Sequence, residues 1–175
     1  MKKQDILENQ ANRVYLSLGS NLGKKRKNLE TAKSLLSSYG MNIKKVSSFY
    51  RTKSWPNKNF PDYLNIIVLI NTNYNLIELF EKIKYIEKLV GRTKGPKNYP
   101  RVCDIDIVDF NGFCLKTSHK NNVIIIPHEN MHNRNFVLFP LYEINKNWIH
   151  PKFKKNIVNL LSKLSIMDLS SVKLI

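Results

Sequence analysis

Cysteine, acidic residues and long apolar runs are all scarce in this sequence. The two cysteines, Cys103 and Cys114, are too few for a disulfide framework and form no CxxC motif, so a reducing compartment is expected. No apolar run approaches the roughly 20 residues that a membrane-spanning helix needs. The opening stretch, MKKQDILENQAN, lacks the apolar core of a secretion signal. We therefore expect a cytoplasmic protein that is not associated with a membrane.

Acidic side chains are outnumbered by basic ones, 13 to 29, which gives a formal net charge of +16 at pH 7. Such a charge favours anionic partners, which include nucleic acid, a membrane surface and phosphorylated small molecules. Lysine, asparagine and isoleucine are abundant along the whole chain, however, so most of the lysines are expected to be ordinary solvated side chains. The charge alone therefore selects none of these partners.

The length of 175 residues suits one domain with a single core. We predict that domain over residues 13–175, after a disordered or frayed extension over residues 1–12. Apolar periodicity and turn residues predict strands at 13–19, 43–52, 63–72, 103–110 and 123–127, and helices at about 29–39, 75–90 and beyond 132. This order predicts an α+β fold with a ferredoxin-like βαββαβ core and C-terminal additions. The helices should cover one face of an antiparallel sheet and leave the opposite face open.

Two aspartates, Asp104 and Asp106, stand two residues apart in a predicted strand, so their carboxylates share one face, roughly 7 Å apart. Ile105 and Ile107 point to the other face and would anchor the strand in the core. Adjacent carboxylates repel each other, and a divalent cation removes that cost. Mg²⁺ typically takes one or two protein carboxylates together with phosphates and waters. In a chain so poor in acids, we favour a metal site over a solvent-facing strand that merely carries acids.

A basic loop precedes the aspartates and contains Arg92, Lys94, Lys97 and Arg101. Guanidinium groups grip phosphate oxygens bidentately, and a mobile basic loop can close over a triphosphate. Arg101 lies three residues before Asp104, so we predict that it contacts phosphate. For Lys94 and Lys97 a solvated position is the better expectation.

The stretch HENMH, from His128 to His132, matches the zinc-peptidase pattern HExxH letter for letter. A zinc site of that kind needs both histidines on one face of a helix and a third ligand beyond them. Pro127 directly precedes His128, and the VIII run before it is typical of a strand, so an upstream helix is disfavoured. We interpret the match as accidental.

A series of motifs occurs in order between residue 13 and about residue 151. They are GSNLG (19–23), SSFYRT (47–52), PDYLN (61–65), IE…GR (86–92), PR..DIDI (100–107), IPH (126–128), NR.FVL.PL.EI (133–144) and a late His-Pro (150–151). Together they resemble the 6-hydroxymethyl-7,8-dihydropterin pyrophosphokinase family over almost the whole chain. The resemblance implies a Mg²⁺-dependent enzyme of folate biosynthesis that moves a diphosphate from ATP to a pterin alcohol and leaves AMP.

The same resemblance implies a role for individual residues. Asp104 and Asp106 would hold two Mg²⁺ ions and would form the catalytic group with Arg92 and Arg101. The implied ATP contacts are Lys84, Glu87, Arg92, Arg101, Ile107, His128 and Arg134. The implied pterin contacts are Thr52, Lys53, Tyr63, Asn65 and Phe136, with the ring held between Tyr63 and Phe136. Each stacked pair would contribute about 0.5–1.5 kcal/mol. We expect a monomer whose partners are ATP and the pterin, and no nucleic acid.

The chain departs from the family pattern in its basic loop and at two single positions. Where the family usually has Trp-Gly-Pro-Arg, this chain reads Asn98-Tyr99-Pro100-Arg101, and the loop is one residue shorter. Lys84 stands where an amide is common, and Cys103 replaces an aliphatic residue. From these changes we expect the closing motion of the loop and the contacts with ATP to differ from the family pattern.

Two other classes of protein compete with this interpretation. A basic ferredoxin-like sheet can bind RNA, but such a sheet normally exposes aromatic side chains on its central strands. Here the exposed face would carry Asp104 and Asp106, which repel a phosphate backbone unless a metal intervenes. A zinc hydrolase would use His128 and His132 and would contain stoichiometric zinc.

Overall fold

The computed structural model describes residues 11–54, 57–96, 98–120 and 122–175. Most of the predicted N-terminal extension and Lys97, for which a solvated position is predicted, lie outside the described residues. The elements are β1 (Asn12–Ser20), α2 (Lys25–Ser38), β2 (Asn42–Val46), β3 (Tyr50–Thr52), β4 (Tyr63–Thr72), α3 (Leu76–Val90), β5 (Asp104–Phe110), β6 (Leu115–His119), β7 (Asn122–Ile126), a 3₁₀ turn (Met131–Asn133), α4 (Asn135–Ile144), α5 (Ile157–Leu161), α6 (Ile166–Ser170) and β8 (Lys173–Leu174).

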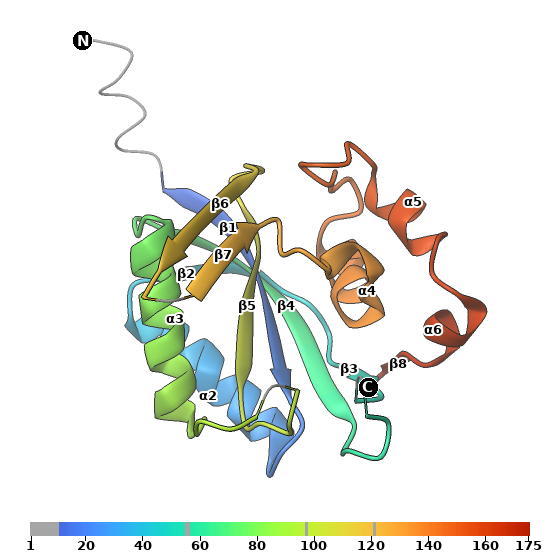
Figure 1. Cartoon of the computed structure of the whole chain (residues 1–175), viewed down its shortest axis with the longest axis horizontal. Coiled ribbons are helices and arrows are strands. Elements are labelled where there is room, and N and C mark those ends of the chain that lie inside the picture. The colour runs from blue at the N-terminus through green and yellow to red at the C-terminus, as the bar shows by residue number, and fades with distance from the viewer. Residues whose placement is uncertain (1–10, 55–56, 97, 121) are drawn as a thin grey trace.

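An antiparallel sheet with the strand order β5-β1-β4-β3-β8 forms the centre of the molecule (Figure 1). β1 pairs with β4 on one side and with β5 on the other. β2 and β3 pair with successive parts of the other edge of β4. The predicted combination of helices with an antiparallel sheet is confirmed.

Alternation along β4 separates the core from the opposite face. Its residues Leu64, Ile66, Val68 and Ile70 are buried with α2 and α3 in one hydrophobic cluster. The predicted helix start is also confirmed. The Asn75 side chain accepts from backbone N–H groups of α3, and the Glu78 side chain accepts from the Asn75 backbone N–H. These local patterns place β4 and α3 accurately.

The prediction that the opposite face is open was wrong in part. α4 and α5 pack on it in a second hydrophobic cluster that includes Ile67 and Leu69 of β4 and Val108 of β5. Because the middle of β4 is apolar on both faces, it needs a second layer to cover it. The end of this face that carries Tyr63 and Asp104 bears polar side chains and borders a pocket.

Two further segments differ from the prediction. The strand predicted at 43–52 is divided into β2 and β3, because the Ser48 amide and hydroxyl donate to Glu143 of α4 at 2.8–3.1 Å instead of pairing with β4. The region 111–122, for which no helix or strand is predicted, contains β6, which forms a hairpin with β7. Within the described ranges, none of the helices combines the length and the apolar character that crossing a bilayer requires.

Candidate active site

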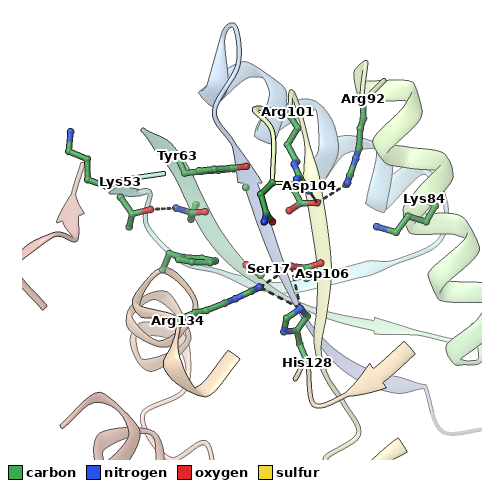
Figure 2. A pocket seen from close by; sticks show the side chains of 15 residues that line it. Ser17, Lys53, Tyr63, Lys84, Arg92, Arg101, Asp104, Asp106, His128 and Arg134 are labelled. Carbon is green, nitrogen blue, oxygen red and sulfur yellow. Dashed lines mark hydrogen bonds and ion pairs between the residues drawn. The ribbon is translucent and has the colours of Figure 1, made fainter. Parts of the chain in front are cut away.

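A pocket of about 260 Å³ lies where the polar ends of β1, β4 and β5 meet α3 and the start of α4 (Figure 2). Side chains that are far apart in the sequence come together in it. Its lining residues are Ser17, Gly19, Thr52, Lys53, Tyr63, Asn65, Lys84, Arg92, Asn98, Arg101, Asp104, Asp106, His128, Arg134 and Phe136. Every residue that the sequence nominated lines this pocket except Glu87 and Ile107.

The two aspartates lie at the start of strand β5, and their side chains point toward the pocket. Asp104 pairs in register with Gly19 of β1, and Asp106 pairs with Ser17. Ile105 and Ile107 are buried in the core on the other side. The predicted alternation is therefore confirmed, and it also explains why the Ile107 side chain does not reach the pocket.

Asp104 is the anchor of an arginine pair. Its Oδ1 accepts from Arg92 at 2.6 Å and from Arg101 at 3.1 Å, and Figure 2 shows both guanidinium groups converging on it. Burial would raise the pKa of Asp104, but the Arg101 and Arg92 charges outweigh burial, so the pKa lies below its ordinary value. Asp104 is therefore ionised under ordinary conditions.

Asp106 has a weaker set of partners. Its Oδ2 lies 3.6 Å from Arg134 and 3.9 Å from His128, beyond hydrogen-bond length. Burial and the negative charge of Asp104 raise the pKa of Asp106 above its ordinary value. The repulsion between the two carboxylates is thus only partly relieved by the protein itself.

His128 faces a donor at each ring nitrogen. Nδ1 accepts from the Asn130 amide at 3.3 Å, and Nε2 lies 3.4 Å from the Arg134 guanidinium. Burial lowers the pKa of His128 below its ordinary value, and a neutral imidazole has one acceptor nitrogen only. One of the two contacts is therefore donor against donor, and an acceptor placed between His128 and Arg134 would satisfy both.

Glu87 lies behind the pocket and not in its lining. Its carboxylate is 2% exposed and accepts from Arg92, from Lys84 at 3.0 Å and from the Ile105 amide at 2.7 Å. Burial raises the pKa of Glu87, while Lys84 and Arg92 oppose the rise. Its bonds fix two of the cations that line the pocket and join α3 to β5.

Aromatic side chains bound the other half of the pocket. Tyr63 begins β4, Phe136 lies in the first turn of α4, and Asn65 donates to the Thr52 hydroxyl at 3.0 Å. Lys53 is the outlier, because its side chain is 61% exposed, pairs with Asp62 at 3.1 Å and points away from the acidic pair in Figure 2. This half of the pocket can accept a flat ring with a polar edge.

Sequence reasoning missed three lining residues, Ser17, Gly19 and Asn98. A Cβ on Gly19 would stand 3.0 Å from Asn65 Oδ1 and 3.4 Å from the Tyr63 ring. The signal for Ser17 was available, since it alternates with Gly19 on one face of β1. Nothing local in the sequence marks Asn98.

The GSNLG motif acquires a structural reason. Asn21 is buried, accepts from the Arg101 amide at 2.7 Å and donates to the Pro61 carbonyl at 3.3 Å. The backbone N–H of Asn21 also donates to the Arg101 carbonyl at 3.1 Å. Asn21 therefore fixes the backbone of Arg101 through its side chain and its main chain, beside Asp104 in the charged half of the pocket.

The HExxH match is accidental, as interpreted from the sequence. The segment is not one helix, because the 3₁₀ turn begins only at Met131. His128 lies in the pocket, whereas the His132 ring packs against Phe153 and His150, with ring centroids 4.9 and 6.0 Å apart. The two histidines therefore serve different neighbourhoods.

An acidic pair ringed by cations beside an aromatic slot defines the class of site that handles a phosphorylated ligand and a flat ring. The model of the 7,8-dihydro-6-hydroxymethylpterin-pyrophosphokinase (HPPK) family matches residues 15–146. That match covers most of the chain and all of the pocket-lining residues. The chain belongs to this family.

Curated relatives agree with the family. The 2-amino-4-hydroxy-6-hydroxymethyldihydropteridine pyrophosphokinase of Aquifex aeolicus is 36% identical over 142 residues, 81% of this chain and 86% of that protein. The Bacillus subtilis protein of the same name is 38% identical over 134 residues, 76% of this chain and 78% of that protein. The folic acid synthesis protein fol1 of Pneumocystis carinii is 33% identical over 98% of this chain, but the chain spans only 22% of that longer protein.

A solved structure shares the fold. The HPPK-DHPS protein of Plasmodium falciparum, crystallised with pterin and p-hydroxybenzoate, superposes with a TM-score of 0.78 at 17% identity. The match covers 99% of this chain and 49% of the Plasmodium chain. At that identity the similarity concerns the fold alone.

Proposed function

We propose that this chain transfers the diphosphate of ATP to the hydroxymethyl group of 6-hydroxymethyl-7,8-dihydropterin, giving the pterin diphosphate and AMP in folate synthesis. The observation that carries the proposal is a single cavity that joins Asp104 and Asp106, a ring of cations and an aromatic slot. The bacterial relatives that this chain nearly spans are named as pyrophosphokinases of this pterin. Their names support this substrate, and the two chemically different halves of the cavity support a phosphate subsite and a ring subsite.

The acidic pair fits Mg²⁺. Carboxylate oxygens are the hard donors that Mg²⁺ prefers. Burial and the charge of Asp104 raise the pKa of Asp106, and a bound cation would offset both costs of ionising it. Among the described residues, no three acidic, histidine or cysteine side chains are arranged so that they could hold a metal ion by themselves, so phosphates and waters would complete the coordination. We propose that Asp104 and Asp106 hold two ions. Bound Mg²⁺ would neutralise phosphate charge and lower the pKa of the pterin hydroxyl.

The cations of the pocket would bind the phosphates. Arg92 and Arg101 are already oriented by Asp104, and each keeps further N–H donors for phosphate oxygens. A phosphate oxygen between His128 and Arg134 would be the acceptor that both of them face. Lys84, which stands where the family commonly has an amide, would add one more positive charge to the phosphate-binding part of the pocket.

Glu87 would act through other residues. Its bonds to Arg92 and Lys84 hold these cations toward the cavity while its own carboxylate stays buried. We therefore assign Glu87 a positioning role in place of the direct ATP contact expected from the resemblance. Ile107 has no side-chain role here, because it is 7% exposed and packs in the core.

The aromatic slot would hold the pterin. Tyr63 and Phe136 would stack on the ring, and Asn65 would satisfy a donor and an acceptor on its edge. Thr52 already bonds Asn65 and would keep its amide in one orientation. Lys53, which points outward, would act at the mouth of the slot.

The reaction forms a bond between the pterin hydroxyl oxygen and the β-phosphorus and breaks the bond from that phosphorus to the oxygen that leaves with AMP. The hydroxyl proton passes to water. Such a transfer depends mainly on alignment and charge neutralisation, and the chain supplies both through its arginines and its aromatic slot. The proposal needs no general base from the protein.

The fold and setting complete the proposal. A ferredoxin-like core is supported by the strand order β5-β1-β4 with β2 beside β4 and by α2 and α3 on one face. The scarcity of cysteine supports a reducing, cytoplasmic setting. We propose a monomer, because one chain carries all parts of the pocket.

The test is to incubate the protein with Mg²⁺, ATP and 6-hydroxymethyl-7,8-dihydropterin and to separate the nucleotide products. AMP that appears only with the pterin is the expected result. The Asp104→Ala variant should abolish AMP formation, whereas Glu30→Gln, which removes an exposed acid on α2, should not change it. ADP in place of AMP would mean transfer of a single phosphoryl group and would contradict the proposal.

A further inference from the structure

The last residues of the chain bond to two segments beside the proposed pterin slot, β3 and the first residue of α4. We call residues 165–175 the C-terminal segment; it consists of α6 and β8 with their caps. β8 pairs antiparallel with β3, so that Lys173 lies opposite Arg51, and the Ile175 amide donates to the Phe49 carbonyl at 2.9 Å. β3 ends at Thr52, which lines the slot.

The other attachment of the C-terminal segment is Asn135, the first residue of α4. Its Nδ2 donates to the Asp168 carbonyl at 2.8 Å and to the Ser171 hydroxyl at 2.9 Å. Its Oδ1 accepts from the Phe136 amide at 2.7 Å. One side chain thus joins the C-terminal segment to the residue that forms an aromatic wall.

The C-terminal segment has little hydrophobic support of its own. No residue of α6 is buried, and Ile166, Met167 and Leu174 are 85%, 71% and 65% exposed. Burial at about 25 cal/mol per Å² therefore contributes little to holding it. Its position depends on hydrogen bonds, each worth about 0.5–1.5 kcal/mol net, so its release should affect global stability only slightly.

β3 depends on this support. It has three residues, and without β8 it would be an edge strand bonded to β4 alone. Short segments with few buried contacts open locally at low cost. Opening there would free Thr52, whose hydroxyl orients Asn65, while the charged half of the pocket on α3 and β5 would stay in place.

We propose that the C-terminal segment is a positioning element for the pterin slot, with Asn135 as its attachment residue. It joins β3, whose Thr52 pairs with Tyr63 of β4, to the start of α4, which carries Phe136, and so sets the distance between these two sides of the slot. This inference rests on the proposed function, since it concerns the affinity of the slot for the pterin. It requires an effect on pterin binding that the nucleotide does not share.

Two full-length variants test the inference. Ile175→Pro removes the amide that donates to Phe49, and proline suits the extended backbone before it. Its matched control, Ile175→Ala, keeps that amide and shortens a side chain that is 54% exposed. Asn135→Asp keeps the acceptor for Phe136 but loses both donations to the C-terminal segment, and an acid suits the start of a helix.

Two further control variants lie nearby in the sequence. Ser162→Ala removes the hydroxyl that donates to the Asn159 carbonyl at 3.2 Å, at the end of α5 and outside the pocket lining. Ser171→Thr retains a hydroxyl that can accept from Asn135. These two variants should leave pterin binding as in the unaltered protein.

The measurements are the dissociation constants of fluorescent 6-hydroxymethylpterin and of a non-hydrolysable ATP analogue, the steady-state constants and the melting temperature. We expect the pterin Kd and KM to rise about threefold for Ile175→Pro and about tenfold for Asn135→Asp, in line with one and two lost hydrogen bonds. The ATP-analogue Kd, the kcat at saturating pterin and the melting temperature should stay close to those of the controls.

Two results would overturn the inference. One is a pterin Kd in both variants that equals the control values. The other is a parallel loss of pterin and nucleotide affinity together with a lower melting temperature, which would mark a structural role only. If the unaltered protein binds no pterin and forms no AMP, the proposed function itself fails, and that outcome is separate from the other two.

Discussion

The two halves of the pocket are built by different means. In the charged half, Asp104 and buried Glu87 hold Arg92 and Arg101 through side-chain ion pairs that converge from α3, β5 and the intervening loop. In the half that contains Tyr63 and Phe136, Tyr63 is positioned by backbone pairing between β1, β3 and β4 and by the close approach of Gly19. Changes of charge should therefore act on the nucleotide, and changes of shape should act on the pterin.

The largest effect is expected from Arg101→Ala. A donor directed at developing phosphate charge typically contributes 10²–10³ in rate, so kcat/KM for ATP should fall by about that factor. Arg101→Lys should recover only part of it, because lysine lacks the planar fork. Steady-state kinetics with varied ATP measure the change.

The matched control for Arg101 is Lys94→Ala in the same loop. Lys94 is exposed and does not line the pocket. An equal loss in Lys94→Ala would mean that the loop acts through its net charge and would remove the distinction between placed and solvated cations.

A smaller effect should follow from Tyr63→Ala. Loss of one stacked face should raise the KM for the pterin about tenfold and leave the KM for ATP unchanged. Tyr63→Phe keeps the ring and should behave like the unaltered protein. A requirement for the hydroxyl, seen as weak binding by Tyr63→Phe, would show that the tyrosine acts by polar contact instead.

Gly19→Ala should have an effect of several-fold on the pterin. The added methyl group would press on Asn65 and Tyr63, and overpacking of this kind costs about 1–3 kcal/mol. Gly95→Ala is the control, because a Cβ there meets nothing within 4 Å and needs no unusual backbone conformation. Pterin titration of both variants, with melting temperatures, compares the two positions.

The smallest effect concerns stability in the protein without Mg²⁺. The pKa of Asp104 is lowered in the fold, so its charge contributes stability above the unfolded value of about 3.9 that is lost as the pH falls. The pKa of Asp106 is raised in the fold, so the stability falls as the pH rises above the unfolded pKa and this partly buried carboxyl group must ionise. At pH 7 with a chelator, Asp104→Asn should lower the melting temperature and Asp106→Asn should raise it.

The change in the free energy of unfolding behind each shift should be on the order of 1 kcal/mol or less, since both side chains keep some contact with water. Thermal melts between pH 4 and pH 8 would show the two variants diverging as the pH rises. Shifts of the same sign would mean that the two carboxylates share one environment.

Local pattern predicted much of the fold. The bounds of β4, the capping of α3 and the alternation at Asp104 and Asp106 follow from short-range rules. The division of the 43–52 strand did not, because it depends on Glu143 of α4, some 95 positions further along the chain. The β6 strand was not predicted for a related reason, since its polar residues form a strand only by pairing with β7.

Candidate site residues show the same contrast. The family that the motifs resemble nominated most of the lining, but the burial of Glu87 behind Arg92 could not be foreseen from its position on α3. Gly19 was noticed only as part of the GSNLG motif, whereas the reason that it carries no side chain is Asn65 on the neighbouring strand. Asn135 drew no notice because its partners lie 33 and 36 residues away.

The sequence by itself determined which faces are apolar, where the acidic pair points and which family the motifs resemble, because those properties depend on neighbours within one turn or one strand. The tertiary structure alone decided which cations meet the acids, which of the two carboxylates is ionised more readily and what holds the two walls of the slot. These properties depend on charges and donors brought within a few ångströms by the packing of distant elements, and Coulomb and hydrogen-bond energies are sensitive to such distances.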